Sequence, residues 1–429
     1  MNSQAILGRS DQLYDCGRSR QSRVGLSSCG FAISLKKVAK INRLIQYSYM
    51  SHFNLTLYKL AGLVLILSCI VLTACSDGKV DPVADEKVNA PENWGVFEHT
   101  HIDFTSQTAN KECRLEERGV FYIDPIPKLV ELARNHNVVM INEAHYKPLH
   151  RAFTGELAKA LISLDFNHFG AEGFSPWAFS DDNRNQALVE RGYPVVQDGT
   201  SYVREPIFGQ LMETALENDY TLFAYEVSKP LPEGAKSSQA HRDTEQAKNI
   251  LHELGDDREK KILIHAGYHH IREVPTEFRD TKWMAEYFTE MSGIDPLTIN
   301  QTDCYSQSAY DAGLFGYAMP VDIDGNPISS DGYDVILIPP KEAQYNGRPV
   351  WLQKIGRRFV DVPAELKFDD QYTRITAKNV SKVVSAVVED TIYRPPHSDK
   401  PLSLRPGTYR LEVTGKNKAV LTEAEIKVP

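Results

Sequence analysis

Ionisable side chains directly follow four of the short apolar runs in this sequence. They are Glu143, His145, Glu172, Glu226, His269 and His270. One acidic residue at the end of an apolar run usually has a structural role. We predict a functional site here because four such ends occur in one region. Carboxylates and imidazoles that share a crevice can activate water, by general-base catalysis or through a bound divalent metal ion.

These side chains must be positioned by the apolar runs that precede them. Between Val96 and about Pro340, short apolar runs alternate with longer amphipathic segments, the pattern of strands that alternate with helices. We therefore predict the α/β class, with a mainly parallel sheet flanked by helices, for residues 96–344. In such a sheet the carboxyl ends of the strands share one edge, where ligand crevices form, so the ionisable groups should converge. The expected strands are 138–141, 168–171, 221–225, 261–264, 296–299 and 335–338.

The last part of the chain has a different pattern. From Tyr345 onward alternating strands predominate, and only 380–388 is ambiguous. The turn Leu404-Arg-Pro-Gly-Thr-Tyr409 resembles the penultimate hairpin of small prealbumin-like or Ig-like β-sandwiches. We expect residues 345–429 to form such a module, without a site of its own.

A charge-free apolar stretch, Leu60–Ala74, precedes Cys75. It is too short to cross a bilayer of about 30 Å comfortably, and it fits the apolar core of a signal peptide. The sequence Leu72-Thr-Ala-Cys75 resembles the bacterial lipobox, in which a peptidase cuts before a cysteine that carries a diacylglycerol. We therefore expect a signal peptide over 50–74 and a lipid anchor at Cys75, with translation starting at Met50 and residues 1–49 as a non-structural extension.

The residue after the cysteine indicates the membrane in which the protein is expected to be located. Ser76 stands where an Asp would favour retention in the inner membrane, so we expect a lipoprotein on the periplasmic face of the bacterial outer membrane. Residues 75–95 are polar and lack periodicity, which predicts a flexible tether. Cys113 and Cys304 are the cysteines that remain after the lipidated residue, and an oxidising periplasm favours a disulfide between them. The formal net charge of −9 argues against a nucleic-acid partner.

Four stretches together resemble the superfamily of erythromycin esterases, ChaN and TIKI/TraB proteins. In that superfamily a strand ending in G-E-x-x-H or G-E-x-H is followed by a helix and by a second strand ending in Glu. Here Ile141-Asn-Glu-Ala-His145 and 165–172 are similar to these strands. His241–Ile250 is similar to a helix with the pattern R-D-x-x-M-A-x-N, and Ile264–Ile271 resembles a later strand that ends in G-x-x-H.

The resemblance implies a set of site residues in this chain. Asn142 stands where the first glycine of the pattern is usual, and Gln246 replaces the methionine of the helix. The implied residues are Glu143, His145, Glu172 and His270, with Arg242 as a supporting cation and His269 as a further candidate for substrate binding. Glu226 is another candidate for substrate binding, from its position at a strand end and not from the resemblance.

The superfamily includes several activities. Erythromycin esterases hydrolyse a macrolactone with a histidine-activated water, TIKI members are metal-dependent peptidases, and ChaN is a haem-binding lipoprotein. Our first hypothesis is a hydrolase of the esterase or metallopeptidase type, with His145, His270 and Glu172 as ligands if a divalent metal takes part. The alternative is a haem- or iron-binding lipoprotein, in which Tyr146, Tyr268 or the His269-His270 pair would ligate iron. A scaffold whose site has lost its function is a third interpretation, and the sequence leaves the substrate open.

Overall fold

The computed structural model describes residues 113, 119–179, 182–228, 238–256, 259–276, 282–306, 309–311, 313–330, 332–415 and 419–429. All of them belong to one compact unit, Lys79–Pro429. The extension, the signal peptide, Cys75 and the tether that the sequence predicts lie outside these residues. Of the helices in the described ranges, none combines the length and apolar character that a membrane span requires.

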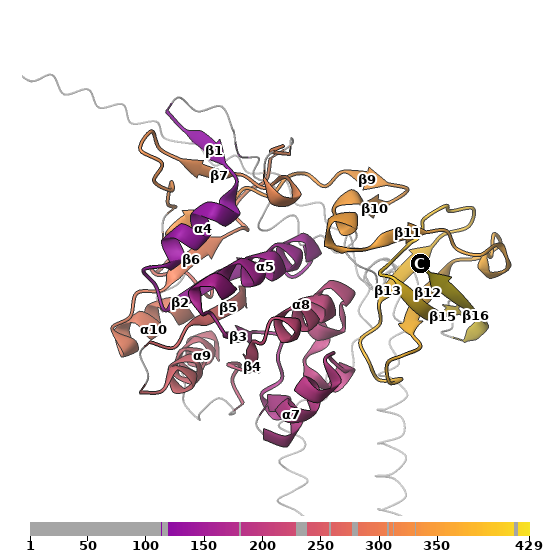
Figure 1. Cartoon of the computed structure of the whole chain (residues 1–429), viewed down its shortest axis with the longest axis horizontal. Helices are drawn as coiled ribbons and strands as arrows, with labels where there is room; N and C mark the ends of the chain where they lie inside the picture. Colours follow the sequence, from indigo (N-terminus) through magenta and orange to yellow (C-terminus); the bar gives the residue numbers. More distant parts are fainter. Residues whose placement is uncertain are drawn as a thin grey trace, which may run out of the picture. The chain divides into compact units, whose positions relative to one another are not determined.

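A six-stranded parallel sheet forms the centre of the α/β region. Figure 1 labels its strands β2, β3, β4, β5 and β6. Its strand order is β4-β3-β5-β2-β6-β8, so β5 lies between the strands that carry Glu172 and Glu143. β2 and β5 are buried along their whole length, because helices cover both faces of the sheet. The predicted α/β class is confirmed. The strands are β2 (Val138–Glu143), β3 (His168–Ala171), β4 (Thr221–Phe223), β5 (Ile262–Gly267), β6 (Leu297–Asn300) and β8 (Val335–Ile336).

The helices form two layers, one on each face of the sheet. Side chains alternate between the two faces of each strand, so successive residues pack against different layers. Val139 packs in one core with α4, α5 and α8, whereas Met140 packs in the other core with α9 and α10. Four of the described helices begin with a proline, whose fixed φ suits the first helical turn. The helices are α4 (Pro125–Ala133), α5 (Pro148–Leu161), α6 (Pro176–Phe179), α7 (Asp182–Arg191), α8 (Pro206–Glu217), α9 (Ser238–Leu254) and α10 (Met284–Ser292).

Short 3₁₀ helices occupy several of the connections. They are η3 (Ile162–Leu164), η4 (Val196–Asp198), η5 (Ser201–Arg204), η6 (Leu314–Gly316), η7 (Val350–Ile355) and η8 (Ala364–Leu366). Of these, η5 leads directly into α8, so the residues before α8 are held close to its first turn.

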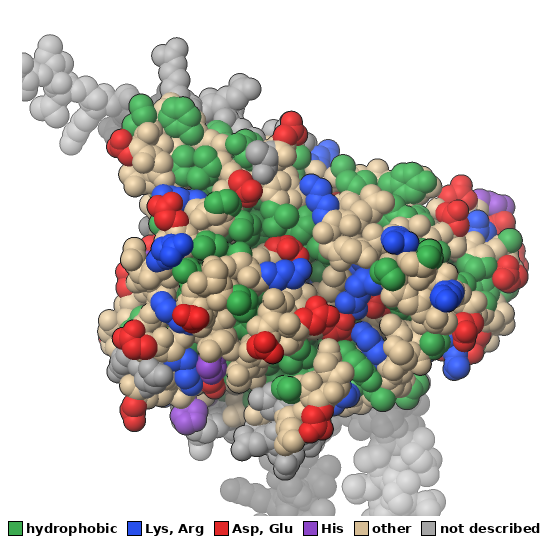
Figure 2. Space-filling model, in the orientation of Figure 1, with side chains coloured by type: hydrophobic (Ala, Val, Ile, Leu, Met, Phe, Trp, Pro, Cys, Tyr) green, Lys and Arg blue, Asp and Glu red, His purple; other side chains and the backbone are tan. Residues whose placement is uncertain are grey.

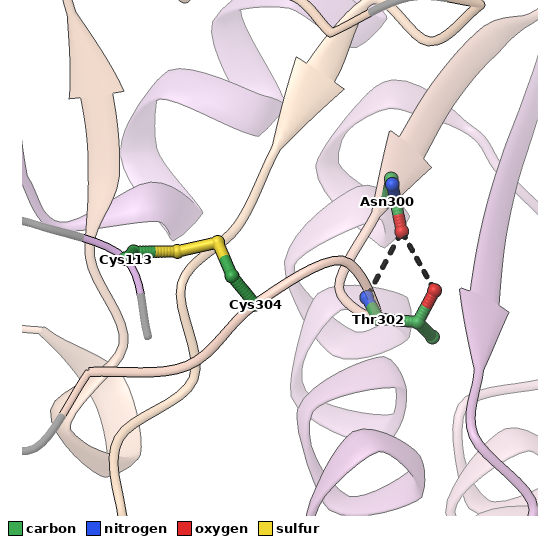
Figure 3. The surroundings of a disulfide bond; sticks show 4 residues. All are labelled: Cys113, Asn300, Thr302 and Cys304. Atoms are coloured by element: carbon green, nitrogen blue, oxygen red, sulfur yellow. Dashed lines mark hydrogen bonds between the residues drawn. A yellow bond between two sulfur atoms is a disulfide. The ribbon is translucent and has the colours of Figure 1, made fainter. Parts of the chain in front are cut away.

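A disulfide joins Cys113 to Cys304, as the sequence predicts, and their Cα atoms lie 5.5 Å apart. Cys304 follows the carboxyl end of β6, where Thr302 bonds to the side chain of Asn300 (Figure 3). The amide of Cys113 donates to the carbonyl of Tyr305 at 2.9 Å. The disulfide therefore fixes Cys113 to the segment that follows the carboxyl end of β6. Next in sequence is β1 (Phe121–Ile123), which pairs with β7 (Met319–Val321) in an antiparallel ribbon.

The C-terminal region contains small antiparallel sheets, as expected for a β domain. One sheet has the order β13-β12-β15-β16 and another pairs β11 with β14, and both contribute to a single apolar core. The strands are β9 (Gln344–Tyr345), β10 (Arg348–Pro349), β11 (Arg358–Val360), β12 (Thr373–Asn379), β13 (Asp390–Arg394), β14 (Leu402–Leu404), β15 (Gly407–Thr414) and β16 (Val420–Val428).

This β region also packs against α8. Glu213 of α8 accepts hydrogen bonds from Lys382 at 2.5 Å and from Arg405 at 2.7 Å. The ambiguous run 380–388 is a loop that docks beside η4, where the amide of Val387 donates to the carbonyl of Pro194. Charged side chains of both signs are interspersed on the face of the molecule shown in Figure 2.

Candidate active site

Three strand ends meet at the carboxyl edge of the sheet. Glu143 ends β2, Glu172 directly follows β3, and Gly267 ends β5 between them. A Cβ atom added to Gly267 would lie 2.6 Å from Nε2 of His145 and 2.7 Å from Oε2 of Glu172. The predicted site residues His145 and Glu172 therefore approach each other across the bare backbone of Gly267.

Glu143 is a buried carboxylate that orients His145. Its Oε1 lies 2.8 Å from Nδ1 of His145, and Arg151 binds both oxygens at 2.6 and 2.9 Å. Arg151 is itself held by Glu205, the N-cap of α8, at 2.9 Å. Burial acts to raise the pKa of Glu143, but the charges of Arg151 and His265 outweigh it and hold this pKa well below its usual range. Glu143 is therefore ionised at neutral pH.

The ring of His145 is the more accessible part of this pair. Its side chain is 22% exposed, against 2% for Glu143. The ring stacks on Tyr202 at 4.3 Å between centroids and meets the edge of Tyr268 at 5.0 Å. Because Nδ1 faces an ionised carboxylate, the neutral ring carries its proton on Nδ1 and its lone pair on Nε2, beside Gly267.

Glu172 is bound by a backbone amide and by Arg242. The amide of Gly267 donates to Oε2 at 2.5 Å, and Arg242 donates to Oε1 at 2.5 Å. Burial acts to raise the pKa of Glu172, but His270, His145 and Arg242 together lower it to about 2. Arg242 also binds both oxygens of Glu226 through Nε, at 3.0 and 3.1 Å. The predicted Arg242 and Glu226 thus belong to the site, with Glu226 acting on the guanidinium.

His270 forms a second carboxylate–histidine pair. Its Nδ1 bonds to Asp243, and its Nε2 lies 3.0 Å from the guanidinium of Arg242 and 3.8 Å from Glu172. Burial acts to lower the pKa of His270, but Glu172 and Asp243 outweigh it and raise this pKa. When Nε2 is unprotonated it accepts from Arg242, and when it is protonated it can pair with Glu172.

His269 has different surroundings from the other predicted residues. Its Nδ1 lies 3.1 Å from the hydroxyl of Tyr333, and its ring lies against Trp283. Its contacts are therefore with residues outside the group around Gly267. The backbone turns here, since Tyr268 has a φ of 46°, and this turn separates the directions of successive side chains.

The predicted metal ligands His145, His270 and Glu172 lie near one another, but Nδ1 of each histidine and Oε1 of Glu172 are engaged by Glu143, Asp243 and Arg242. In the described part of the chain, no group of three or more His, Cys, Asp or Glu side chains is arranged to hold a metal ion. The cation next to Glu172 is a guanidinium.

Sequence reasoning missed five residues of this site: Arg151, Tyr202, Glu205, Asp243 and His265. Asp243 directly follows Arg242 in the helix motif, and this acidic neighbour was the available signal. His265 was detectable as a polar residue inside an otherwise apolar strand. Tyr202 and Glu205 come from the segment before α8, which carries no motif.

The two departures from the superfamily pattern both make hydrogen bonds. Asn142, which replaces a glycine, donates to the carbonyl of Tyr268 and to the side chain of Asn300, both at 2.8 Å. It therefore ties the end of β2 to the turn after β5 and to the end of β6. Gln246, which replaces a methionine, donates to Glu226 at 3.1 Å.

The low pKa of Glu172 predicts that the free energy of unfolding falls at acid pH. Because this pKa is about 2 in the folded chain and about 4.5 otherwise, the stabilisation is present above pH 4.5 and is lost as the pH falls toward 2. Its full size is on the order of 3 kcal/mol. Between pH 5 and about pH 3, we expect the free energy of unfolding to fall less in Glu172→Gln than in the unmodified protein. Urea titration of both proteins measures this difference. If the free energy of unfolding falls equally with pH in the two proteins, Glu172 does not have this low pKa in the folded chain.

No protein-family model matches the chain, and no curated protein matches it. Three solved structures are distant structural neighbours. The RRSP effector domain of a Vibrio vulnificus MARTX toxin is 17% identical, with a TM-score of 0.31, over 41% of this chain and 35% of that one. Campylobacter jejuni ChaN, described with cofacial haem binding, is 12% identical, with a TM-score of 0.31, over 52% and 99%. The C-terminal region of Pasteurella multocida toxin, described with a thiol-protease-like triad, is 11% identical, with a TM-score of 0.30, over 52% and 28%.

The chain spans about a third of the length of the two toxin structures. The class that the fold and the site define is an α/β protein with paired carboxylate–histidine groups at the carboxyl edge of its sheet.

Proposed function

We propose that this protein is a hydrolase in which His145, oriented by Glu143, takes a proton from water. The observation that carries the proposal is the 2.8 Å contact between Nδ1 of His145 and a buried carboxylate, which leaves Nε2 as the base at a partly exposed position. A neutral imidazole can accept a proton from water, and the carboxylate fixes its tautomer. The resemblance of 138–271 to the erythromycin-esterase, ChaN and TIKI/TraB superfamily supports the same reaction class.

Arg242 and His270 would act on the other side of the reacting carbonyl. Arg242 is held in place by Glu172 and Glu226, so its positive charge is already oriented for the oxyanion that develops during hydrolysis. His270, paired with Asp243, would hold the proton that the leaving group receives. These roles divide the reaction between a base at His145 and an electrophilic group at Arg242 and His270.

Haem or iron binding of the ChaN type is the alternative, and the contacts of His270 argue against it. Nδ1 of His270 bonds to Asp243 and Nε2 faces Arg242, so this ring would have to lose a partner before it could ligate iron. The two buried carboxylates, Glu143 and Glu172, would also have no evident task on a haem face.

A substrate panel tests the proposal on the full chain. We expect turnover of at least one compound among p-nitrophenyl esters, lactones and short peptides, with and without added Zn²⁺ or Mn²⁺. A parallel titration with haemin should give no stoichiometric change in the Soret band. Failure to turn over any member of the panel, together with stoichiometric haem binding, would replace the hydrolase with the alternative.

We further propose that the chain is a lipoprotein of the outer membrane, anchored at Cys75 on the periplasmic face. The lipobox-like sequence that ends at Cys75 supports this location. We expect Cys75→Ala to abolish incorporation of labelled palmitate and retention in the membrane fraction of a bacterial host. Cys69→Ala, in the same apolar leader, is the matched control and should be labelled like the unmodified protein. Equal labelling of Cys75→Ala would place the processing site elsewhere.

A further inference from the structure

We propose that His265 is a positioning residue whose Nε2 pairs with Glu143 and thereby holds this carboxylate in the orientation that His145 requires. The inference rests on the proposed function, because it assigns a partner to the Glu143–His145 pair. It concerns a side chain that none of the sequence motifs singled out.

The sheet places His265 directly behind the carboxylate. In β5 it lies two residues before Gly267, so both face the layer of α5 and α8, as Glu143 does. Its side chain is 1% exposed, and its Nε2 lies 3.0 Å from Oε2 of Glu143. Phe208 of α8 meets the ring edge at 6.0 Å between centroids, which fills the space beside it.

The proton positions follow from the partners of Thr154. Its hydroxyl has one proton and lies 3.0 Å from the carbonyl of His150 and 3.1 Å from Nδ1 of His265. If the proton goes to His150, Nδ1 donates to Thr154, and Nε2 carries a proton only when the ring is charged. If the proton goes to His265, Nδ1 is an acceptor and the neutral ring carries its proton on Nε2. The second arrangement, and a charged ring in the first, present a proton from Nε2 to Glu143.

With this contact, four nitrogen atoms surround the two oxygens of Glu143 and fill the space around them. Oε1 faces His145 and Arg151, and Oε2 faces Arg151 and His265. A carboxylate that is surrounded in this way cannot turn without losing a partner. Removing His265 would leave Oε2 to Arg151 alone and concentrate negative charge toward His145, which makes the imidazolium of His145 more stable.

The expected direction of the pH effect takes account of the other charges. Of the groups around the Glu143–His145 pair, only His265 is removed by the substitution. Because the imidazolium of His145 is then more stable, the acid limb of the pH profile of kcat/KM should move to higher pH. The titratable and charged groups that face this pair from the packed elements are His150 and Arg151 of α5, Tyr202 of η5, Glu205 at the start of α8, Glu172 after β3, Arg242 of α9, and His265 and Tyr268 of β5 and its turn.

The test compares His265→Leu with His265→Gln in the full chain. Leu fills the space without a donor, whereas the amide of Gln can reach Oε2 of Glu143. We expect His265→Leu to lower kcat about 10- to 100-fold with little change in KM and to move the acid limb upward. His265→Gln should recover most of the rate and the original limb. His168→Gln, at a histidine outside the site, is the control for the loss of an imidazole.

A second readout separates this inference from the proposed function. The ring of His145 can be titrated by ¹H–¹³C NMR with labelled histidine, without any substrate. We expect its midpoint to rise in His265→Leu and to stay unchanged in His265→Gln. An unchanged midpoint in a folded His265→Leu protein would overturn the inference even if the protein hydrolyses esters. If His265→Leu fails to fold, His265→Asn replaces it, because the shorter amide reaches Thr154 but not Glu143.

Discussion

His145→Ala is expected to lower kcat/KM by about two to four orders of magnitude for any substrate that the protein hydrolyses, the usual scale for an acid–base group. The loss follows from removing the base, while Glu143 keeps its two bonds to Arg151 and the sheet edge keeps its structure. Stability should change little, because the ring of His145 is partly exposed. Steady-state kinetics and urea unfolding of the same preparations check both statements.

The matched control for this variant is His252→Ala. His252 is exposed in the last turn of α9, the helix that also carries Arg242, so it removes an imidazole without touching the sheet edge. We expect unchanged kinetics from it. A loss smaller than about fivefold in a folded His145→Ala protein would mean that water is activated by another group, and His270 would be the next candidate.

Asp390→Asn is expected to lower the free energy of unfolding by about 3–5 kcal/mol. Asp390 begins β13, and both its oxygens lie 2.9 Å from Arg348 of β10, with each side chain fully buried. Oδ2 also accepts from the amide of Ser403 at 2.7 Å. The amide of Asn carries no charge that could balance the buried guanidinium of Arg348. Urea or thermal unfolding of the full chain measures the loss.

A more accessible ion pair in the same β region provides the comparison. Lys378 of β12 and Glu412 of β15 lie 2.8 Å apart, with side chains that are 35% and 20% exposed. Water screens this pair, so Glu412→Gln should cost less than about 1 kcal/mol. If Glu412→Gln and Asp390→Asn lower the free energy of unfolding equally, burial does not determine the cost of breaking the ion pair of Arg348.

The strands of the α/β region were predictable because their apolar runs are short and are separated by amphipathic segments. The predicted run 168–171 is β3 as observed, and 138–141 lies within β2 (Val138–Glu143). The order of the strands was not predictable, because it depends on which helices cross which face. That β5 lies between β2 and β3 decides which side chains can touch, and no local pattern encodes it.

The site was predictable where a residue follows a strand and was missed where it lies inside an element. Glu143 and Glu172 come at strand ends, so the common edge of a parallel sheet was enough to place them together. Arg151 lies within α5 among several other polar residues, and His265 is the one polar residue in the apolar strand β5. Their role becomes apparent only through the burial of Glu143, whose charge requires partners.

The parallel register at Gly267 restricts how this site can change. Glu143 pairs with Gly267 across β2 and β5, and Ala171 pairs with His265 across β3 and β5. A one-residue insertion within β5 would turn His265 toward the α9–α10 layer and put a side chain where Gly267 now leaves room. Substitutions can exchange individual groups around this edge, whereas the length of β5 must stay constant for the groups to meet at all.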